Sequence, residues 1–313
     1  MIENKFLPAV SVIVPIYNGD RDLPELIERL KKQTYPVENV EYLLVNNNSR
    51  DRTAEILENV AKKNNNFHHL TQKKIQSSYA ARNLGIRQAK NDILVFTDAD
   101  CRPKSNWIEE IVRPFIKPEV GIVVGEVVAL PGKSLLEKYA DRNQLMSQKF
   151  LLEHSFLPYG QTANIAIRKQ AFIEAGLFRP YLTTGGDADI CWRIQKEGKW
   201  QLEFAPDAII EHRHRSTFKN FRSQFRRYGS SNHYLHELHG VDLMRELTTK
   251  EVIYRLSRWV LKELPRNSIK AIAGKASLVD LISTPIDLIG FQARTTGQKE
   301  SKLPEEAKTI EWL

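Results

Sequence analysis

The feature that most constrains the fold is a regular alternation of strand and helix patterns over the first hundred residues. Short runs rich in Val, Ile and Leu predict buried strands at 10–15, 42–45 and 93–97. Apolar residues at helical spacing predict intervening helices at 22–33, 51–63 and 79–90. Strands that alternate with helices form a parallel sheet through right-handed crossovers. The sequence therefore predicts a doubly wound, mostly parallel α/β sheet of the nucleotide-binding kind.

The pattern changes beyond Pro131. A strand is predicted at 120–129, a long polar helix at 134–153, a return to the sheet at 163–167 and a helix at 187–197 that ends at Gly198. Four aromatic residues at helical spacing predict an apolar helix face within 217–228, and the tail after Gly240 is helical in character. We expect a catalytic domain over 1–240, with halves at about 9–130 and 131–240, and a helical extension over 241–313.

Composition narrows the setting. The chain has 313 residues, 42% of them hydrophobic, and a net charge of +8, which favours anionic partners such as phosphorylated substrates, acidic lipid headgroups or nucleic acid. Its two cysteines, Cys101 and Cys191, have no spacing typical of a zinc site or a disulfide framework. The apolar run at 9–16 is too short for a signal sequence, and that at 276–291 is shorter than the roughly 20 residues that span a bilayer. We expect a cytoplasmic protein, with a peripheral position at the inner face of the membrane left open.

Two carboxylates follow the strand predicted at 93–97. Asp98 and Asp100 alternate along the chain, where the carboxyl end of a strand in an open α/β sheet meets its ligand. Oxygen ligands of this kind suit Mg²⁺ or Mn²⁺, with substrate phosphates completing the shell. The alternative is a pair of turn-forming, helix-capping aspartates before Pro103.

A second acidic group begins the helix predicted at 187–197. Asp187 can cap this helix, and Asp189 can pair with Arg193 at the i,i+4 spacing. Asp187 can instead act as the general base for an acceptor hydroxyl, because a carboxylate beside a glycine-rich loop can reach a substrate. The residues alone weight these two interpretations about equally.

Five motifs in order resemble family 2 glycosyltransferases of the GT-A fold. They are VIVPIYN at 12–18, NNNSRD at 46–51, ARNLG at 81–85, TDAD at 97–100 and DADICWR at 187–193. The resemblance covers about residues 9–232, and the order and spacing of the motifs make it specific. It implies an inverting, metal-assisted transfer of a sugar from a nucleotide diphosphate to an acceptor hydroxyl, in polysaccharide or glycolipid assembly.

The resemblance also implies roles for single residues. Pro15, Tyr17 and Asn18 match the loop that cradles the nucleotide, Asn47 and Asp51 match the loop at the base, and Arg82 matches an arginine at the base or diphosphate. Asp98 matches the ribose-side aspartate, Asp100 the metal ligand and Asp187 the catalytic base, and His212 matches a histidine that reaches the metal or diphosphate. Asp189 belongs to the same donor-site motif. The residues expected at the nucleotide-sugar are therefore Pro15, Tyr17, Asn18, Asn47, Asp51, Arg82, Asp98 and Asp189. Those expected at the metal are Asp98, Asp100 and His212.

Two positions depart from the family pattern. Asn46 stands where relatives commonly have aspartate, so the donor nucleotide stays open between UDP, GDP and dTDP. Gly186 stands where many relatives have glutamate before the catalytic aspartate. These departures keep a catalytically silent nucleotide-sugar or membrane-surface binding protein as the alternative. A sugar nucleotidyltransferase is less favoured, because no glycine- and arginine-rich loop follows the first strand.

The stretch QFRRY at 224–228 resembles the Gln-x-x-Arg-Trp motif of processive polysaccharide synthases, with Arg227 facing the diphosphate. The competing interpretation is an amphipathic helix with solvated arginines. Basic residues among apolar ones in the tail, from Arg245 to Lys275, are compatible with an anionic membrane and a lipid-linked acceptor, or with packing on the catalytic domain. A carbohydrate acceptor is equally compatible. Nucleic-acid binding is not expected, because no recognised module is present.

Overall fold

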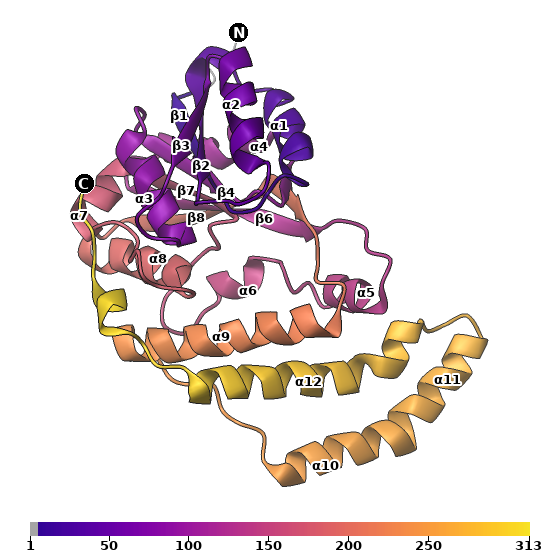
Figure 1. Cartoon of the computed structure of the whole chain (residues 1–313). Coiled ribbons are helices and arrows are strands. Elements are labelled where there is room, and N and C mark those ends of the chain that lie inside the picture. The colour runs from indigo at the N-terminus through magenta and orange to yellow at the C-terminus, as the bar shows by residue number, and fades with distance from the viewer. Residues whose placement is uncertain (1–5) are drawn as a thin grey trace. The chain divides into compact units, whose positions relative to one another are not determined.

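The computed structural model describes residues 6–313, and its central feature is an eight-stranded sheet (Figure 1). The strand order is β3-β2-β1-β4-β7-β6-β8-β5. The strands are β1 (Val10–Ile16), β2 (Val40–Asn46), β3 (Phe67–Thr71), β4 (Ile93–Thr97), β5 (Cys101–Pro103), β6 (Val120–Ala129), β7 (Asn164–Arg168) and β8 (Gln201–His212).

The sheet is mixed rather than mostly parallel. β3, β2, β1 and β4 pair in parallel, in the order predicted by strand–helix alternation. β7 runs antiparallel to both β4 and β6, and β5 runs antiparallel to β8. The four strands that pair in parallel all lie within the half expected at 9–130, and β7 is the strand inserted in the opposite direction between β4 and β6.

Helices cover both faces of the sheet. Even-numbered residues of β1 pack into one core with α1 (Leu23–Lys31), α2 (Thr53–Lys63) and α4 (Trp107–Val112). Ile13, on the opposite face, lies against Gly85 of α3 (Ser78–Gln88), where a Cβ atom would come within 2.5 Å of the Ile13 side chain. Phe96 of β4 meets Phe172 of α7 (Lys169–Ala175) on that same side. This close packing holds the second half of α3 against the middle of β1.

The prediction of one long helix at 134–153 is wrong, because the segment forms two short helices. α5 (Leu135–Arg142) ends before Gln144, whose φ of 49° breaks the helical path, and α6 (Lys149–Leu152) follows. The Gln148 side chain is buried and donates to the carbonyls of Gly125 (2.9 Å) and Asn164 (2.8 Å). These tertiary hydrogen bonds replace the turns that a continuous helix would have made.

Three strands carried no prediction. β3 lies at the edge of the sheet and contains two histidines, β5 has three residues, and β8 includes Pro206 and Asp207. Each is too short or too polar for the periodicity that marks a buried strand. The helix predicted at 187–197 is confirmed as α8 (Gly186–Glu197), with Gly198 at its end.

The chain forms two compact units, which differ from the division expected at residue 240. The first comprises residues up to Val128, Met146–His212 and Pro304–Leu313, and the second comprises Ala129–Leu145 and Arg213–Leu303. The whole sheet core and the last ten residues therefore belong to the first unit. Short 3₁₀ helices in this unit are Val37–Asn39, Arg113–Ile116 and Glu305–Lys308.

The second unit is helical, as expected of the tail. α9 (Phe218–His239) packs along α12 (Leu278–Glu300), with Gly229 against the carbonyl of Arg294 and Gly297 against that of Arg226 (Figure 1). α10 (Thr249–Arg258), a π-helical turn (Trp259–Glu263) and α11 (Leu264–Ile272) precede α12. The aromatic face predicted within 217–228 is only partly buried, since Phe221 is in the core but Phe218 is 50% exposed.

Across residues 6–313, none of the helices combines the length and the hydropathy that crossing a membrane requires.

Candidate active site

The turn between β4 and β5 carries the Asp-Ala-Asp motif. β4 ends at Thr97, and the Cys101 N–H donates to the Asp98 carbonyl at 3.1 Å before β5 begins. No helix starts at this turn, so the aspartates do not serve as helix caps. The side chains of Asp98 and Asp100 are each about one third exposed, which leaves both carboxylates accessible to a ligand.

Arg82 of α3 faces this turn. Its Nη2 lies 2.5 Å from Oδ1 of Asp98, and its side chain is 4% exposed. The Arg82 guanidinium also lies over the Tyr79 ring at 5.8 Å. Its Nε is buried and has no hydrogen-bond acceptor within residues 6–313. A buried guanidinium with an unused donor beside an accessible carboxylate is suited to an anionic ligand.

β8 brings His212 to the second aspartate. Cys101 of β5 is in register with His212, and His212 Nε2 lies 3.2 Å from Asp100 Oδ2. Ligand atoms of Asp100, Cys101 and His212 lie within 4.8 Å of one another. Burial raises the pKa of the Cys101 thiol well above its usual range, so the thiol stays protonated. A carboxylate and an imidazole remain; the carboxylate is a donor that suits Mg²⁺ or Mn²⁺, whereas the imidazole is a donor typical of transition metals.

Asp187 lies in the first turn of α8. Gly185, at φ +81°, precedes the helix as its N-cap residue, so Asp187 is not the cap. Thr162 Oγ1 donates to Asp187 Oδ1 at 2.8 Å, and the Gly186 N–H donates to the Tyr79 hydroxyl at 3.0 Å. These bonds fix the helix start against α3.

The environment of Asp187 favours its neutral form. Burial raises the pKa of Asp187 above its usual range, Arg82 and Thr162 oppose this rise, and the charge of Asp98 adds to it. Arg82 contacts both Asp98 and the Tyr79 ring, and the Tyr79 hydroxyl binds the residue before Asp187, so these groups lie close together. A carboxyl with a raised pKa is suited to accepting a proton.

The loops after β1 and β2 are joined by hydrogen bonds. Asn18, at φ +49°, accepts from the Arg50 N–H at 2.9 Å, and its own N–H donates to Ser49 Oγ at 2.9 Å. Asp51 accepts from the N–H groups of Asp20 and Thr53, each at 3.0 Å. Burial alone would raise the pKa of Asp51, but hydrogen bonds from Thr53 and Asp20 lower it overall. Asp51 therefore organises the loops as a structural anion.

Three other predicted residues lie in or beside these loops. Pro15 is buried in β1, whereas Tyr17 just beyond it is 50% exposed. Asn47 is 6% exposed, and its Oδ1 has no donor within the part of the chain that the structure describes. Asn46, by contrast, accepts from the Ser49 N–H at 2.9 Å. Of these two amides, Asn47 is the one whose buried oxygen has no partner among the described residues.

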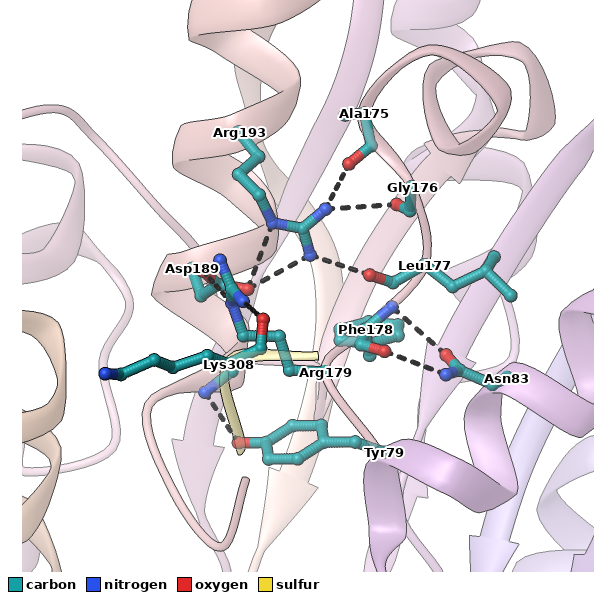
Figure 2. Close-up of polar contacts among 11 residues, drawn as sticks. Tyr79, Asn83, Ala175, Gly176, Leu177, Phe178, Arg179, Asp189, Arg193 and Lys308 are labelled. Atoms are coloured by element: carbon teal, nitrogen blue, oxygen red, sulfur yellow. Dashed lines mark hydrogen bonds and ion pairs between the residues drawn. The ribbon is translucent and has the colours of Figure 1, made fainter. Parts of the chain in front are cut away.

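Asp189 is committed to the interior, as Figure 2 shows. Its carboxylate is 0% exposed and accepts from Arg179 Nε at 3.0 Å and from Arg193 Nε and Nη2 at 3.1 and 3.0 Å. The i,i+4 pairing with Arg193 is the structural alternative foreseen from the sequence. Asp189 is therefore not assigned to the binding of the donor, because arginines occupy both of its carboxylate oxygens.

The C-terminal segment supports the same cluster. Arg179 also donates to the Lys308 carbonyl (Figure 2). The Leu177 N–H donates to the Glu311 carbonyl at 2.8 Å. Asn83 Nδ2 donates to both the Phe178 carbonyl (2.8 Å) and Glu311 Oε2 (3.0 Å). The tail thereby holds the segment 176–179 that leads toward the loop before α8.

Several of these supporting residues had no predicted role. Thr162 contacts Asp187, Tyr79 contacts the neighbouring Gly186, and Asn83 and Glu311 hold the segment before them. Asn83 lies within a recognised motif, but its partner Glu311 is 228 residues away, which no local pattern can reveal. Arg227 is exposed on α9 of the second unit, and its role stays a prediction.

Comparison with known proteins gives consistent results. The family model described as Glycosyl transferase family 2 matches residues 11–182. Glycosyltransferase AglE of Haloferax volcanii is 31% identical over 257 residues, which span 82% of this chain and 81% of AglE. The pre-mycofactocin glycosyltransferase of Mycobacterium tuberculosis is 29% identical over 49% of the chain, and the match spans 33% of that protein.

A solved structure shares the fold. The mannosyltransferase PcManGT from Pyrobaculum calidifontis, in complex with GDP-Man and Mn²⁺, superposes with a TM-score of 0.66 at 17% identity. The match covers 95% of this chain and 88% of that one. At this identity the likeness establishes the fold alone.

Proposed function

Because the chain belongs to glycosyltransferase family 2 and has the GT-A fold, we propose that it is an inverting enzyme. It moves a sugar from a nucleotide-diphosphate donor to an acceptor hydroxyl, in cell-surface polysaccharide or glycolipid assembly. The observation that carries the proposal is a chain of contacts from the Asp-Ala-Asp turn to the start of α8. Arg82 lies 2.5 Å from Asp98 and over the Tyr79 ring, and the Tyr79 hydroxyl accepts from the N–H of Gly186, the residue before Asp187. These contacts support a base candidate beside a cation and the Asp-Ala-Asp turn.

Asp187 is the proposed base. Its carboxylate takes the proton of the acceptor hydroxyl as the acceptor oxygen forms a bond to the anomeric carbon. The bond from that carbon to the donor phosphate oxygen breaks in the same step, and the nucleoside diphosphate leaves with the electron pair. One displacement inverts the anomeric centre. The hydrogen bond from Thr162 Oγ1 (2.8 Å) holds one carboxylate oxygen in place, which leaves the other to receive the proton.

Asp100 and His212 are the proposed holders of a divalent cation, Mn²⁺ or Mg²⁺, with Asp98 nearby. A bound cation neutralises charge that develops on the departing diphosphate. The support is the 3.2 Å contact between Asp100 and His212, whose oxygen and nitrogen donors suit these ions. A neighbour with the same fold was solved with Mn²⁺, which agrees with this donor set. Arg82 is proposed to add positive charge beside the same anionic group from the side of α3, where its guanidinium already meets Asp98.

The base of the donor is proposed to meet Asn47. Its buried Oδ1 can accept from a ring N–H, a group that uracil, thymine and guanine share. The donor is therefore proposed to be a UDP-, GDP- or dTDP-sugar, with Tyr17 and Asn18 lining the same loop. The GDP-Man bound to the structural neighbour is one member of this class.

The acceptor is proposed to be a carbohydrate or a lipid-linked sugar. A lipid-linked acceptor would place the enzyme at the inner face of a membrane, which agrees with the net charge of +8.

Release of nucleoside diphosphate tests the proposal. Purified protein is supplied with UDP-, GDP- and dTDP-sugars and a range of acceptors, with Mn²⁺, Mg²⁺ or chelator. Wild type is compared with Asp100→Ala and Asp187→Asn, and each variant is checked for folding by circular dichroism. Release that needs the cation and both aspartates supports a metal-assisted transferase and identifies the donor.

The competing function is a catalytically silent nucleotide-sugar binding protein, which Asn46 and Gly186 keep in view. Calorimetric titration of the same donors separates the two. Donor binding by folded wild-type protein, with no release from any donor and acceptor pair, would favour the silent protein. Asp187→Asn should bind the donor as well as wild type in either case, because the base acts on the acceptor.

A further inference from the structure

An unusual surface lies on the continuous helix formed by residues 249–272, called the rod below. It consists of α10, the π-helical turn and α11, which follow one another without a break (Figure 1). One side of the rod faces α12, since Trp259 Nε1 donates to the Leu281 carbonyl at 2.8 Å and Asn267 Nδ2 to that of Asp280 at 2.9 Å. The remaining sides of the rod are turned to solvent.

The solvent side of the rod is rich in large apolar residues. Five of them have exposed fractions between 59% and 89%. They are Ile253, Tyr254, Leu261, Ile269 and Ile272. Exposed apolar residues gathered on one element mark an interaction site. A helix that only covers a core would place such residues toward α12.

Basic residues accompany the apolar ones. Residues 249–275 contain seven lysines or arginines and two glutamates, an excess of five positive charges. One glutamate, Glu263, is paired with Arg258 at 2.8 Å, and the other, Glu251, with Arg245 at 2.9 Å. Exposed cations on the rod itself include Arg255, Lys262, Arg266 and Lys270. The surface is therefore both apolar and strongly cationic.

We propose that the solvent side of the rod docks on the surface of an anionic lipid bilayer. The apolar side chains enter the boundary between headgroups and acyl chains, while the basic residues meet lipid phosphates. The long stems of lysine and arginine allow their charges to stay at the headgroups while neighbouring residues insert deeper. The charge and the exposed apolar residues are both accounted for by this one partner.

A second copy of the chain fits the surface less well. A two-fold symmetric contact would place the basic residues of one rod against those of the other, and like charges at an interface repel. Nucleic acid would satisfy the cations but leave the five apolar side chains in water. The bilayer is thus the partner that the composition of the surface favours.

Vesicle flotation tests the proposal with the full chain. Vesicles of phosphatidylcholine alone are compared with vesicles that also contain phosphatidylglycerol. We expect binding to the anionic vesicles, weakened by salt. Leu261→Glu and Ile272→Glu should weaken this binding by about tenfold or more, because a carboxylate opposes both insertion and the anionic surface. Ile116→Glu is the matched control, since Ile116 is 65% exposed but lies in the first unit.

A second pair of variants separates charge from hydrophobicity. Lys262→Glu with Lys270→Glu should reduce binding to anionic vesicles by more than about tenfold, at roughly 1 kcal/mol for each basic residue near the surface. Equal binding of wild type and both sets of variants would overturn the proposal. So would a dimer, seen by sedimentation velocity, that Leu261→Glu abolishes, because the rod would then be a subunit interface.

The result is independent of the transferase activity. Nucleoside diphosphate release with a short water-soluble acceptor should be the same for Leu261→Glu and for wild type. If Leu261→Glu loses vesicle binding but still releases nucleoside diphosphate, the rod acts in membrane docking and not in catalysis. If wild type releases no nucleoside diphosphate, the proposed transferase chemistry is contradicted, and the test of the rod is unaffected.

Discussion

Glu311, close to the C-terminus, accepts a hydrogen bond at 3.0 Å from Asn83, which lies 228 residues earlier in α3. Arg87 donates to the same Glu311 oxygen at 2.9 Å. Asn83 is completely buried and also binds both the N–H and the carbonyl of Phe178. The C-terminal segment is therefore part of the packing that holds the segment before the proposed base.

Replacement of Glu311 should affect both stability and turnover. Glu311→Ala removes the acceptor of a buried Asn83 N–H, so we expect a loss of about 1–2 kcal/mol in the free energy of unfolding. The segment 176–179 should loosen, and kcat should fall severalfold with little change in the donor KM. Glu311→Gln keeps an acceptor oxygen and should recover most of both losses. Thermal unfolding and steady-state kinetics measure the two effects.

Glu305→Ala is the control for this prediction, because Glu305 lies in the same segment with an 87% exposed side chain and a surface partner. A similar loss in Glu305→Ala would show that any change in the tail has this effect.

The proposed base gives a prediction on pH. Burial raises the pKa of Asp187, and only the charged carboxylate can accept the acceptor's proton, so the rate should fall as pH drops through that raised pKa. Asp187→Asn should lower kcat by about 10²–10⁴-fold. The measurement is kcat against pH for wild type and Asp187→Asn; an acid limb that persists unchanged in the residual activity of the variant would contradict the assignment.

The raised pKa of Asp187 also predicts how stability depends on pH: activity should fall at low pH, whereas the contribution of Asp187 to stability should fall at high pH. A carboxyl whose folded pKa is raised contributes stability below its unfolded pKa, and this contribution is lost as pH rises through the folded pKa. At neutral pH the charged Asp187 thus disfavours folding, so Asp187→Asn should unfold at the same temperature or a higher one. Thermal melts at pH 5 and pH 8 check this, and the variant's advantage should shrink at the lower pH. A clearly less stable variant at pH 8 would mean that the carboxylate is structural.

Removal of either proposed metal ligand should weaken cation binding. Asp100→Ala and His212→Ala each delete one member of the 3.2 Å pair, so affinity for Mn²⁺ in the presence of a nucleoside diphosphate should fall about tenfold or more. Electron paramagnetic resonance of free Mn²⁺ measures binding without turnover. Asp207→Ala removes an exposed carboxylate from β8 and should bind Mn²⁺ as wild type does. Equal affinities in all four proteins would refute the site.

The buried cluster around Asp189 should dominate local stability. Arg193→Met deletes one of its two arginines and the donors to the carbonyls of Ala175, Gly176 and Leu177. Breaking a buried ion pair from one side costs about 3–5 kcal/mol, and chemical denaturation should show a loss of that order. Arg113→Met removes an arginine that is 61% exposed and should change stability by less than about 1 kcal/mol. Similar losses in the two variants would argue against the buried cluster.

Local chemistry in the sequence determined much of this protein. Runs of β-branched residues and helical periodicity predicted β1, β2, β4 and α1 to α3, because burial and hydrogen bonding within a short segment decide such elements. The position of Asp98 and Asp100 at the carboxyl end of a strand indicated a ligand site, and the resemblance of the motifs to the family indicated Asp187 and Arg82.

Tertiary structure decided what depends on partners distant in the chain. The register of Cys101 opposite His212 sets the Asp100 contact, and Gln148 breaks the helix expected at 134–153 through bonds to Gly125 and Asn164. Asp189 became a structural anion because Arg179 and Arg193 converge on it in the interior. The return of Glu311 to Asn83 likewise depends on how the whole chain folds. Sequence periodicity reports burial along one segment, whereas these contacts are set by which segments become neighbours.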